Sequence, residues 1–294
     1  MVRAFSPERI ELVFIIQGEN TCLRAQSNCP VKICFLGAAR HYKTVPMGIF
    51  SLLPIAASFA QTCVFFGAKM ASISPRRRLI MDTHQIKWNE HIAKKIIEQL
   101  DKRGMEGSYA ASAAQAREEI IAMIPQGSKV YRCGSMTAVY MDLWQRIAKI
   151  PGVEIIDPFQ PGLSFEDSLE PRRKGLTADV MITSTNAITL DGKLINLDGL
   201  GNRVAAMIFG PQKVILVVGM NKVVPDVETA IARTKHYSAP VNAIRMGIKT
   251  PCVENGICVD CKTPARICNI WTTIEGQRIK GRIHVKLIGE NLGY

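Results

Sequence analysis

Residues 178–222, ADVMITSTNAITLDGKLINLDGLGNRVAAMIFGPQKVILVVGMNK, alternate apolar runs with short polar turns. The runs at 178–189, 193–198 and 213–219 are rich in β-branched residues, which predicts strands. Asp191-Gly192 joins the first two runs and predicts a two-residue hairpin turn. Residues 204–209 predict a helix that leads into the third strand. This stretch therefore predicts strands and helices that follow one another along the chain.

The chain on both sides continues this alternation. At 82–103 apolar residues recur every three or four positions, which predicts an amphipathic helix. The other predicted elements are a helix at 113–124 capped by Ser112, a strand at 129–132, a helix ending near Pro151, a strand at 153–157, a helix at 227–237 and a final strand at 282–289. The sequence predicts an α/β fold with a mostly parallel sheet and flanking helices.

Polar residues follow several of the predicted strands and form a candidate binding site. The turns at 133–137, CGSMT, and 198–203, DGLGNR, each lead into a helix, and Asn221-Lys222 follows a buried strand. Ligands of open α/β sheets bind outside the carboxyl ends of the strands, and helix N-termini favour anions. We therefore expect a small anion such as a carboxylate or phosphate, although capping alone also explains 133–137.

Four cysteines lie close together near the end of the chain, at Cys252, Cys258, Cys261 and Cys268 within the segment 251–269. Four thiolates at this spacing could bind Zn²⁺ or a [4Fe–4S] cluster. Spacing alone does not separate the two, and redox-active or simply reduced thiols are the alternatives. No Ser/His/Asp or phosphate-loop pattern accompanies them, so hydrolase and nucleotide-hydrolase functions have no support.

Residues 1–80 differ in composition from the rest of the chain. They hold ten of the 37 Lys and Arg but three of the 25 Asp and Glu, so they carry much of the net charge of +12. We expect translation to start naturally at Met81, because AGG codons for Arg77 and Arg78 would form a ribosome-binding site before it. Residues 1–80 are then a non-native or disordered extension. There are two alternatives. One is a membrane or targeting segment, which the uncharged stretch 45–68 suggests, and the other is an extra domain.

Residues 178–224 and 251–269 together resemble the LUD domain family (formerly DUF162), which includes the lactate-utilisation proteins LutC and LutB. The resemblance extends over about 88–293. It implies a fold like those of ribose-5-phosphate isomerase, glucosamine-6-phosphate deaminase (NagB) and the CoA transferases. The positions that match the family's polar motifs are Gly134, Ser135, Thr137, Asn186, Asp198, Gly201, Asn202, Arg203, Asn221 and Lys222. Cys133 and Tyr140 depart from the pattern, because many members have Gly and Glu there.

The resemblance implies a cytoplasmic subunit of a lactate-type 2-hydroxy-acid oxidation system, with iron–sulfur or oxidoreductase subunits as partners. In this reading Arg203 and Lys222 attract the anion, Asn186 and Asn202 orient it, and Asp198 orders its loop or moves a proton. The alternatives are a sugar-phosphate or CoA-ester enzyme and a non-catalytic assembly protein with a structural metal. Because no basic stripe with interleaved aromatic residues is present, we expect no nucleic-acid binding, and we expect no membrane association.

Overall fold

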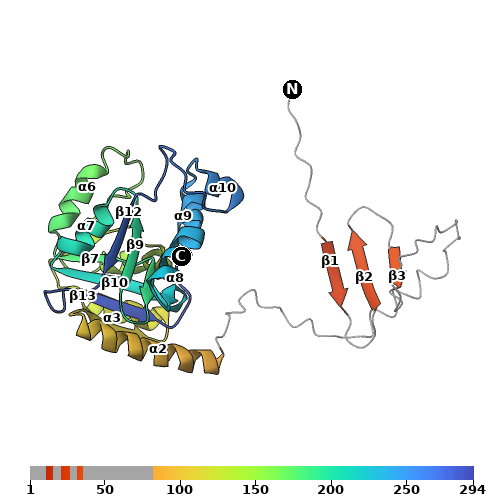
Figure 1. The fold of residues 1–294 in the computed structure, drawn as a ribbon, viewed down its shortest axis with the longest axis horizontal. Coiled ribbons are helices and arrows are strands. Elements are labelled where there is room, and N and C mark those ends of the chain that lie inside the picture. Colours follow the sequence, from red (N-terminus) through yellow and green to blue (C-terminus); the bar gives the residue numbers. More distant parts are fainter. Residues whose placement is uncertain (1–10, 16–20, 27–31, 36–81) are drawn as a thin grey trace. The chain divides into compact units, whose positions relative to one another are not determined.

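The structure is a computed structural model that describes residues 11–15, 21–26, 32–35 and 82–294. The chain divides into two units, Met1–Arg76 and Arg77–Tyr294. In the first unit, β1 (Glu11–Ile15), β2 (Thr21–Gln26) and β3 (Lys32–Phe35) form an antiparallel sheet in that order (Figure 1). The uncharged stretch 45–68 lies outside the described residues. The expectation of a natural start at Met81 stays a prediction.

The second unit contains a six-stranded sheet in which every neighbouring pair is parallel. Its strands in spatial order are β4 (Glu106–Ala110), β13 (Ile283–Ile288), β10 (Lys213–Gly219), β7 (Val180–Thr183), β5 (Lys129–Arg132) and β6 (Glu154–Ile156). The predicted α/β fold with a parallel sheet is therefore confirmed. The sequence pattern does not predict β4, because its residues EGSYA lack the apolar alternation of a strand.

A smaller sheet holds β11 (Val223–Val224), β8 (Ala187–Thr189), β9 (Leu194–Asp198) and β12 (Ile270–Ile274), in that order. The single strand predicted at 178–189 is wrong, because its two halves, β7 and β8, belong to different sheets. The chain leaves the large sheet at Ser184 and Thr185, whose hydroxyls donate to Val217 O and Ile195 O, respectively. The hairpin turn at 190–192 is one residue longer than predicted, since Thr189 N donates to Lys193 O.

Helices flank the sheet (Figure 1). They are α2 (Thr83–Lys102), α3 (Ala113–Ala122), α4 (Met136–Tyr140), α5 (Leu143–Ile147), α6 (Leu169–Lys174), α7 (Asn202–Phe209), α8 (Val227–Arg233), α9 (Ala239–Met246) and α10 (Pro251–Asn255). The predicted cap of α3 is confirmed, since Ser112 Oγ accepts from Gln115 N. The single helix predicted to end near Pro151 is instead two short helices, because Asp142 between them is left-handed, with φ of 52°.

Two hydrophobic clusters cover the two faces of the large sheet. Along β10, Leu216 belongs to one cluster, and Ile215 and Val217 belong to the other, as the two-residue period of a strand requires. Helix α2 packs in the first cluster through Ile96 and Leu100. Helices α3 and α5 pack in the second. Both faces are thus covered, which is typical of parallel sheets.

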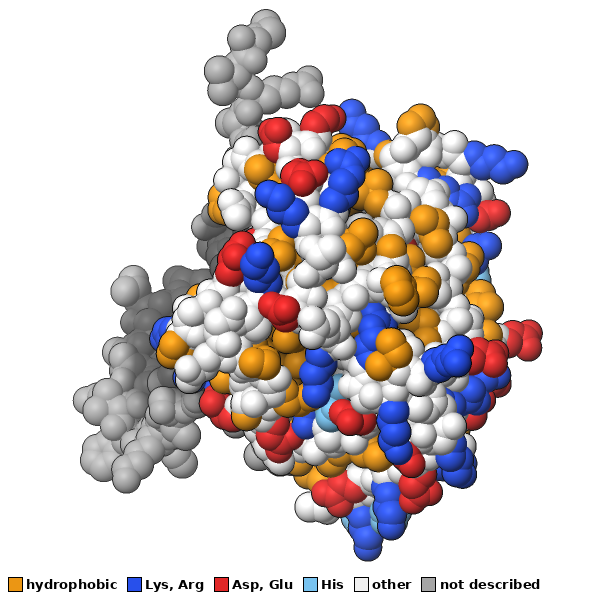
Figure 2. Space-filling model, turned by 90° about the vertical axis from the view of Figure 1, so that its left-hand side faces the viewer, with side chains coloured by type: hydrophobic (Ala, Val, Ile, Leu, Met, Phe, Trp, Pro, Cys, Tyr) orange, Lys and Arg blue, Asp and Glu red, His pale blue; other side chains and the backbone are white. Residues whose placement is uncertain are grey.

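Within the described part of the chain, no helix has both the length and the apolarity needed to cross a membrane. On the face that Figure 2 shows, acidic and basic side chains are interspersed, and hydrophobic side chains lie between them. The expected absence of nucleic-acid and membrane partners stays a prediction.

Candidate functional site

The polar turns predicted from the sequence meet at one edge of the large sheet. Strands β10, β7 and β5 are parallel neighbours, so the residues that follow them leave the sheet on the same side. Gly219 ends β10 and leads into Asn221 and Lys222, Thr183 ends β7, and Arg132 ends β5. This is the edge at which parallel α/β sheets bind ligands.

Lys222 lies at the centre of this edge and is 3% exposed. Its Nζ donates to Thr137 Oγ1 at 3.0 Å and to Ser184 Oγ at 2.8 Å. Both hydroxyls give their own protons to backbone carbonyls, Thr137 to Leu292 O and Ser184 to Val217 O. Each hydroxyl therefore acts as an acceptor toward the lysine. Ser184 was not singled out from the sequence, because its position among Ser and Thr residues carries no signal.

The environment of Lys222 disfavours its charged form. Burial is the main cause, and the positive charges of Arg233 and Arg203 add to it, so the pKa of Lys222 falls to about 7. A buried lysine usually has a carboxylate partner, but the hydrogen bonds of Lys222 go to neutral hydroxyls. Near neutral pH the amine therefore exists in both protonation states.

Arg203 uses its guanidinium to hold the loops around the site. Nη1 donates to Asn196 Oδ1 at 2.7 Å and Ser184 O at 3.1 Å, and Nη2 donates to Asn186 Oδ1 at 3.0 Å and Leu197 O at 2.9 Å. These donors are directed at the protein itself. Arg203 therefore contributes positive potential to the site, while its role as a direct ligand contact stays a prediction.

Asp198 orders the turn that leads into α7. Its Oδ1 accepts from Gly199 N at 2.7 Å and its Oδ2 accepts from Val204 N at 3.1 Å. Gly201 precedes the helix with φ of 88°, a conformation that favours glycine. Of the two predicted roles of Asp198, these contacts favour the ordering of the loop over the movement of a proton.

Asn202 is half-buried and contacts two buried residues in and beside β5. Its Nδ2 donates to Tyr131 Oη at 3.1 Å and lies 3.8 Å from Cys133 Sγ. Burial raises the pKa of the Cys133 thiol to about 11, so the thiol is protonated at neutral pH. Next to it, Ser135 Oγ accepts from Ala138 N at 3.2 Å and caps α4. Capping thus accounts for Ser135, whereas Thr137 reaches Lys222.

Asn221 and Arg233 complete the edge. Asn221 Nδ2 donates to Gly293 O at 3.0 Å and its Oδ1 accepts from Leu292 N at 3.0 Å. Arg233 donates to Asn221 O at 3.1 Å and to Asn186 O at 2.9 Å, and burial lowers its pKa. The sequence of the predicted helix at 227–237 favours an exposed basic face with Arg233, Lys235 and His236. Arg233 departs from this interpretation, because its guanidinium lies against the strand ends.

His236 and His284 are not part of this site. His236 is exposed beyond α8, as its predicted basic face requires. His284 lies in β13, with Nε2 2.8 Å from Ser108 Oγ and Nδ1 3.2 Å from Glu106 Oε2. Burial lowers its pKa. Its predicted place in the final strand is confirmed.

The cysteines form a second group, in the segment that follows α9. Cys252, Cys258, Cys261 and Cys268 all line one cavity. Burial, followed by the negative potential of Cys258, raises the pKa of Cys268 to about 11, and Cys252 and Cys261 add to this effect. In residues 82–294 and the three strands before them, no three or more His, Cys, Asp or Glu side chains are arranged to hold a metal ion. The metal or cluster stays a prediction.

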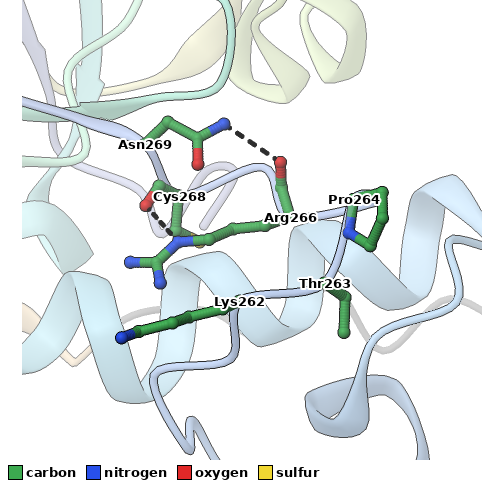
Figure 3. A pocket seen from close by; sticks show the side chains of 6 residues that line it. All are labelled: Lys262, Thr263, Pro264, Arg266, Cys268 and Asn269. Carbon is green, nitrogen blue, oxygen red and sulfur yellow. Dashed lines mark hydrogen bonds between the residues drawn. The ribbon is translucent and has the colours of Figure 1, made fainter.

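Arg266 fixes the loop that carries three of these cysteines. Its guanidinium donates to Cys268 O at 2.7 Å, to Cys261 O at 2.5 Å and to Asp260 Oδ1 at 3.0 Å. Figure 3 shows Arg266, Lys262 and Cys268 around a hollow in the surface of this loop, with Asn269 bonded to Arg266 O. Lys262 and Arg266 thus lie beside Cys268, and the charge of Arg266 offsets part of the effect of burial on the pKa of this thiol.

Comparison with known proteins identifies the family of this chain. The family model of the LUD domain matches residues 93–288. A search of curated proteins finds no match. Among solved structures, a DUF162 family protein from Deinococcus radiodurans is similar, with 15% sequence identity over 68% of this chain and 98% of that chain and a TM-score of 0.41. Because the family model covers more than half of the chain, this protein belongs to the LUD domain family.

Proposed function

We propose that this chain is a cytoplasmic component of a lactate-type 2-hydroxy-acid oxidation system and that it binds a small carboxylate at the strand-end site. Membership of the LUD family supports the association with lactate utilisation. The observation that carries the proposed binding site is Lys222, a buried amine with hydroxyl partners between two arginines. An incoming carboxylate would supply the negatively charged partner that the hydrogen bonds of Lys222 lack.

The three side chains proposed to bind the carboxylate are Thr137, Asn221 and Lys222. Each presents a hydrogen-bond donor at the same edge, and Thr137 and Lys222 are already in contact. Arg203 and Arg233 hold the surrounding loops and add positive potential. Donors that are held in place by the surrounding loops favour the binding of an anion.

Carboxylate binding should be coupled to proton uptake. The pKa of free Lys222 is lowered to about 7, and a bound anion favours the charged form and raises it. At pH 8 the complex therefore takes up a fraction of a proton. Calorimetric titration with L-lactate in two buffers of different ionisation enthalpy measures this uptake directly. Binding without proton exchange at pH 8 would contradict the role given to Lys222.

Thr137→Val tests the location of the site with little change in side-chain volume. It removes a donor, and we expect L-lactate affinity to fall about tenfold, the value of one hydrogen bond to a charged group. Thr177→Val changes an exposed threonine in another part of the chain and serves as the control. Equal affinities of the two variants would contradict this location. Glycolate, sugar phosphates and CoA titrated in parallel identify the ligand class and test the isomerase and CoA-ester alternatives.

We further propose that Cys252, Cys258, Cys261 and Cys268 hold a metal, either Zn²⁺ or a [4Fe–4S] cluster. The four thiols share one cavity, and Arg266 and Lys235 lie at its lining, so thiolate charge is partly balanced. A cluster would supply one-electron transfer to oxidoreductase partner subunits, and zinc would stabilise the segment. Metal analysis of anaerobically purified protein distinguishes them. Cys258→Ser should lose the metal and Cys133→Ser should retain it, and metal-free wild-type protein would overturn the proposal.

A further inference from the structure

The residues after β13 cross the strand-end edge. Gly289 N donates to Ala110 O at 2.9 Å, and Glu290 accepts from Met220 N at 3.2 Å through its carbonyl and from Ala113 N at 3.0 Å through its carboxylate. These bonds fix the start of the segment against the ends of β4 and β10. Asn291, the next residue, is exposed, and residues 292–294 return to the protein.

Leu292 and Gly293 occupy the donors of two proposed ligand residues. Thr137 Oγ1 donates to Leu292 O at 3.2 Å, and Asn221 Nδ2 donates to Gly293 O at 3.0 Å. Asn221 Oδ1 also accepts from Leu292 N at 3.0 Å. Two carbonyl oxygens of the main chain therefore sit where a carboxylate would need to place its oxygens.

Gly293 also approaches Lys222 closely. A Cβ atom on Gly293 would lie 2.5 Å from Thr137 Oγ1 and 3.2 Å from Lys222 Nζ. The φ of Gly293 is +67°, so both the space and the backbone conformation favour glycine. Lys222 is 3% exposed, and hence a ligand reaches its amine only when this segment moves.

We propose that residues 291–294, which we call the cap, occupy the anion site of the free protein and that a small carboxylate binds by displacing them. This inference rests on the proposed function. The carboxylate can replace the two carbonyl oxygens of the cap, because it accepts hydrogen bonds from the same Thr137 and Asn221 donors. A carboxylate also pairs with protonated Lys222, and charge-assisted bonds are stronger than those to a neutral carbonyl. The cap thus keeps the site closed until an anion arrives.

Gly293→Ala opens the cap without altering the residues that bind the ligand. The added Cβ cannot fit beside Thr137, so the closed position of the cap loses one or two hydrogen bonds. We therefore expect Lys222 in the variant to react with N-acetoxysuccinimide at least tenfold faster than in the wild type, which is roughly the value of one such bond. Peptide mass spectrometry quantifies this acetylation. Gly247→Ala is the matched control, since Gly247 has φ of +63° and open space around its Cβ position. Equal acetylation of Lys222 in wild type and Gly293→Ala would overturn the cap.

Displacement is measured separately, by hydrogen–deuterium exchange of residues 291–294 with and without L-lactate. We expect faster exchange when the anion is bound and tighter L-lactate binding by Gly293→Ala. If calorimetry detects binding but exchange of the cap is unchanged, displacement is refuted. If Gly293→Ala exposes Lys222 but neither protein binds any tested anion, the proposed function and displacement both fail, while the covering of Lys222 stands.

Discussion

Replacement of Lys222 by methionine should change the pH dependence of stability in a defined direction. Methionine is similar in length to lysine but carries no titratable group. Thr137 and Ser184 keep their carbonyl acceptors in the variant, so no hydroxyl proton is left without a partner. The main change is therefore the removal of an amine whose protonated form is disfavoured in the native state.

The expected magnitude follows from the pKa of Lys222, which is about 7 in the folded protein and has an ordinary value of 10.5. Between these two values the unfolded chain binds a proton that the native protein does not hold. Raising the pH therefore stabilises the native state, by about 1.4 kcal/mol per pH unit where the difference is one full proton. Because Lys222 is half protonated at pH 7, we expect its contribution to the free energy of unfolding to rise by about 2 kcal/mol between pH 7 and 9.

Urea denaturation of wild type and Lys222→Met at several pH values isolates this contribution, since other titrating groups are common to both proteins. The free energy of unfolding of the wild type, relative to the variant, should rise from pH 7 to 9. Lys286→Met provides a contrast, because it removes the buried partner of Glu119 and should destabilise the protein. A wild-type-minus-Lys222→Met difference that is constant with pH would refute the reasoning.

The remaining predictions concern stability. Arg203→Lys loses the planar fork that serves four acceptors, and we expect a loss of about 2–4 kcal/mol in urea denaturation; an unchanged midpoint would show that the fork is dispensable. Gly175→Ala places a Cβ 2.5 Å from the buried ring of Tyr131, so thermal unfolding should report a loss of stability of about 1–3 kcal/mol. Gly134→Ala meets one atom of Phe159 at 3.4 Å and should be nearly neutral; equal losses in the two glycine variants would contradict the packing argument.

Elements with a long periodic pattern could be predicted from the sequence. Helix α2 spans Thr83–Lys102 and strand β10 spans Lys213–Gly219, each close to its predicted bounds. Residues 178–189 could not be divided correctly, because a continuous apolar run is compatible with one strand or two. At the break, Ser184 donates to Val217 O, a contact with a strand 33 residues away that the local pattern does not contain.

The sequence also predicted that polar turns gather at one edge, because the carboxyl ends of parallel strands lie on the same side of a sheet. It did not predict which hydrogen-bond partners the side chains at this edge have. The guanidinium of Arg203 donates to Asn196 and Asn186, and Arg233 donates to Asn221 O, and neither set of partners could be read from the sequence. Thr137 and Lys222 are in direct contact although 85 residues separate them.

Residue order alone determined the alternation of helices and strands and the parallel sheet, and it predicted the edge at which we expect a ligand, since these follow from local periodicity and turn chemistry. Only the tertiary structure decided that Lys222 is buried among hydroxyls and arginines and that Leu292 and Gly293 lie over it. The physical reason is that the pKa of an amine and the partner of a donor depend on the groups packed around them, and segments far apart in the sequence supply those groups.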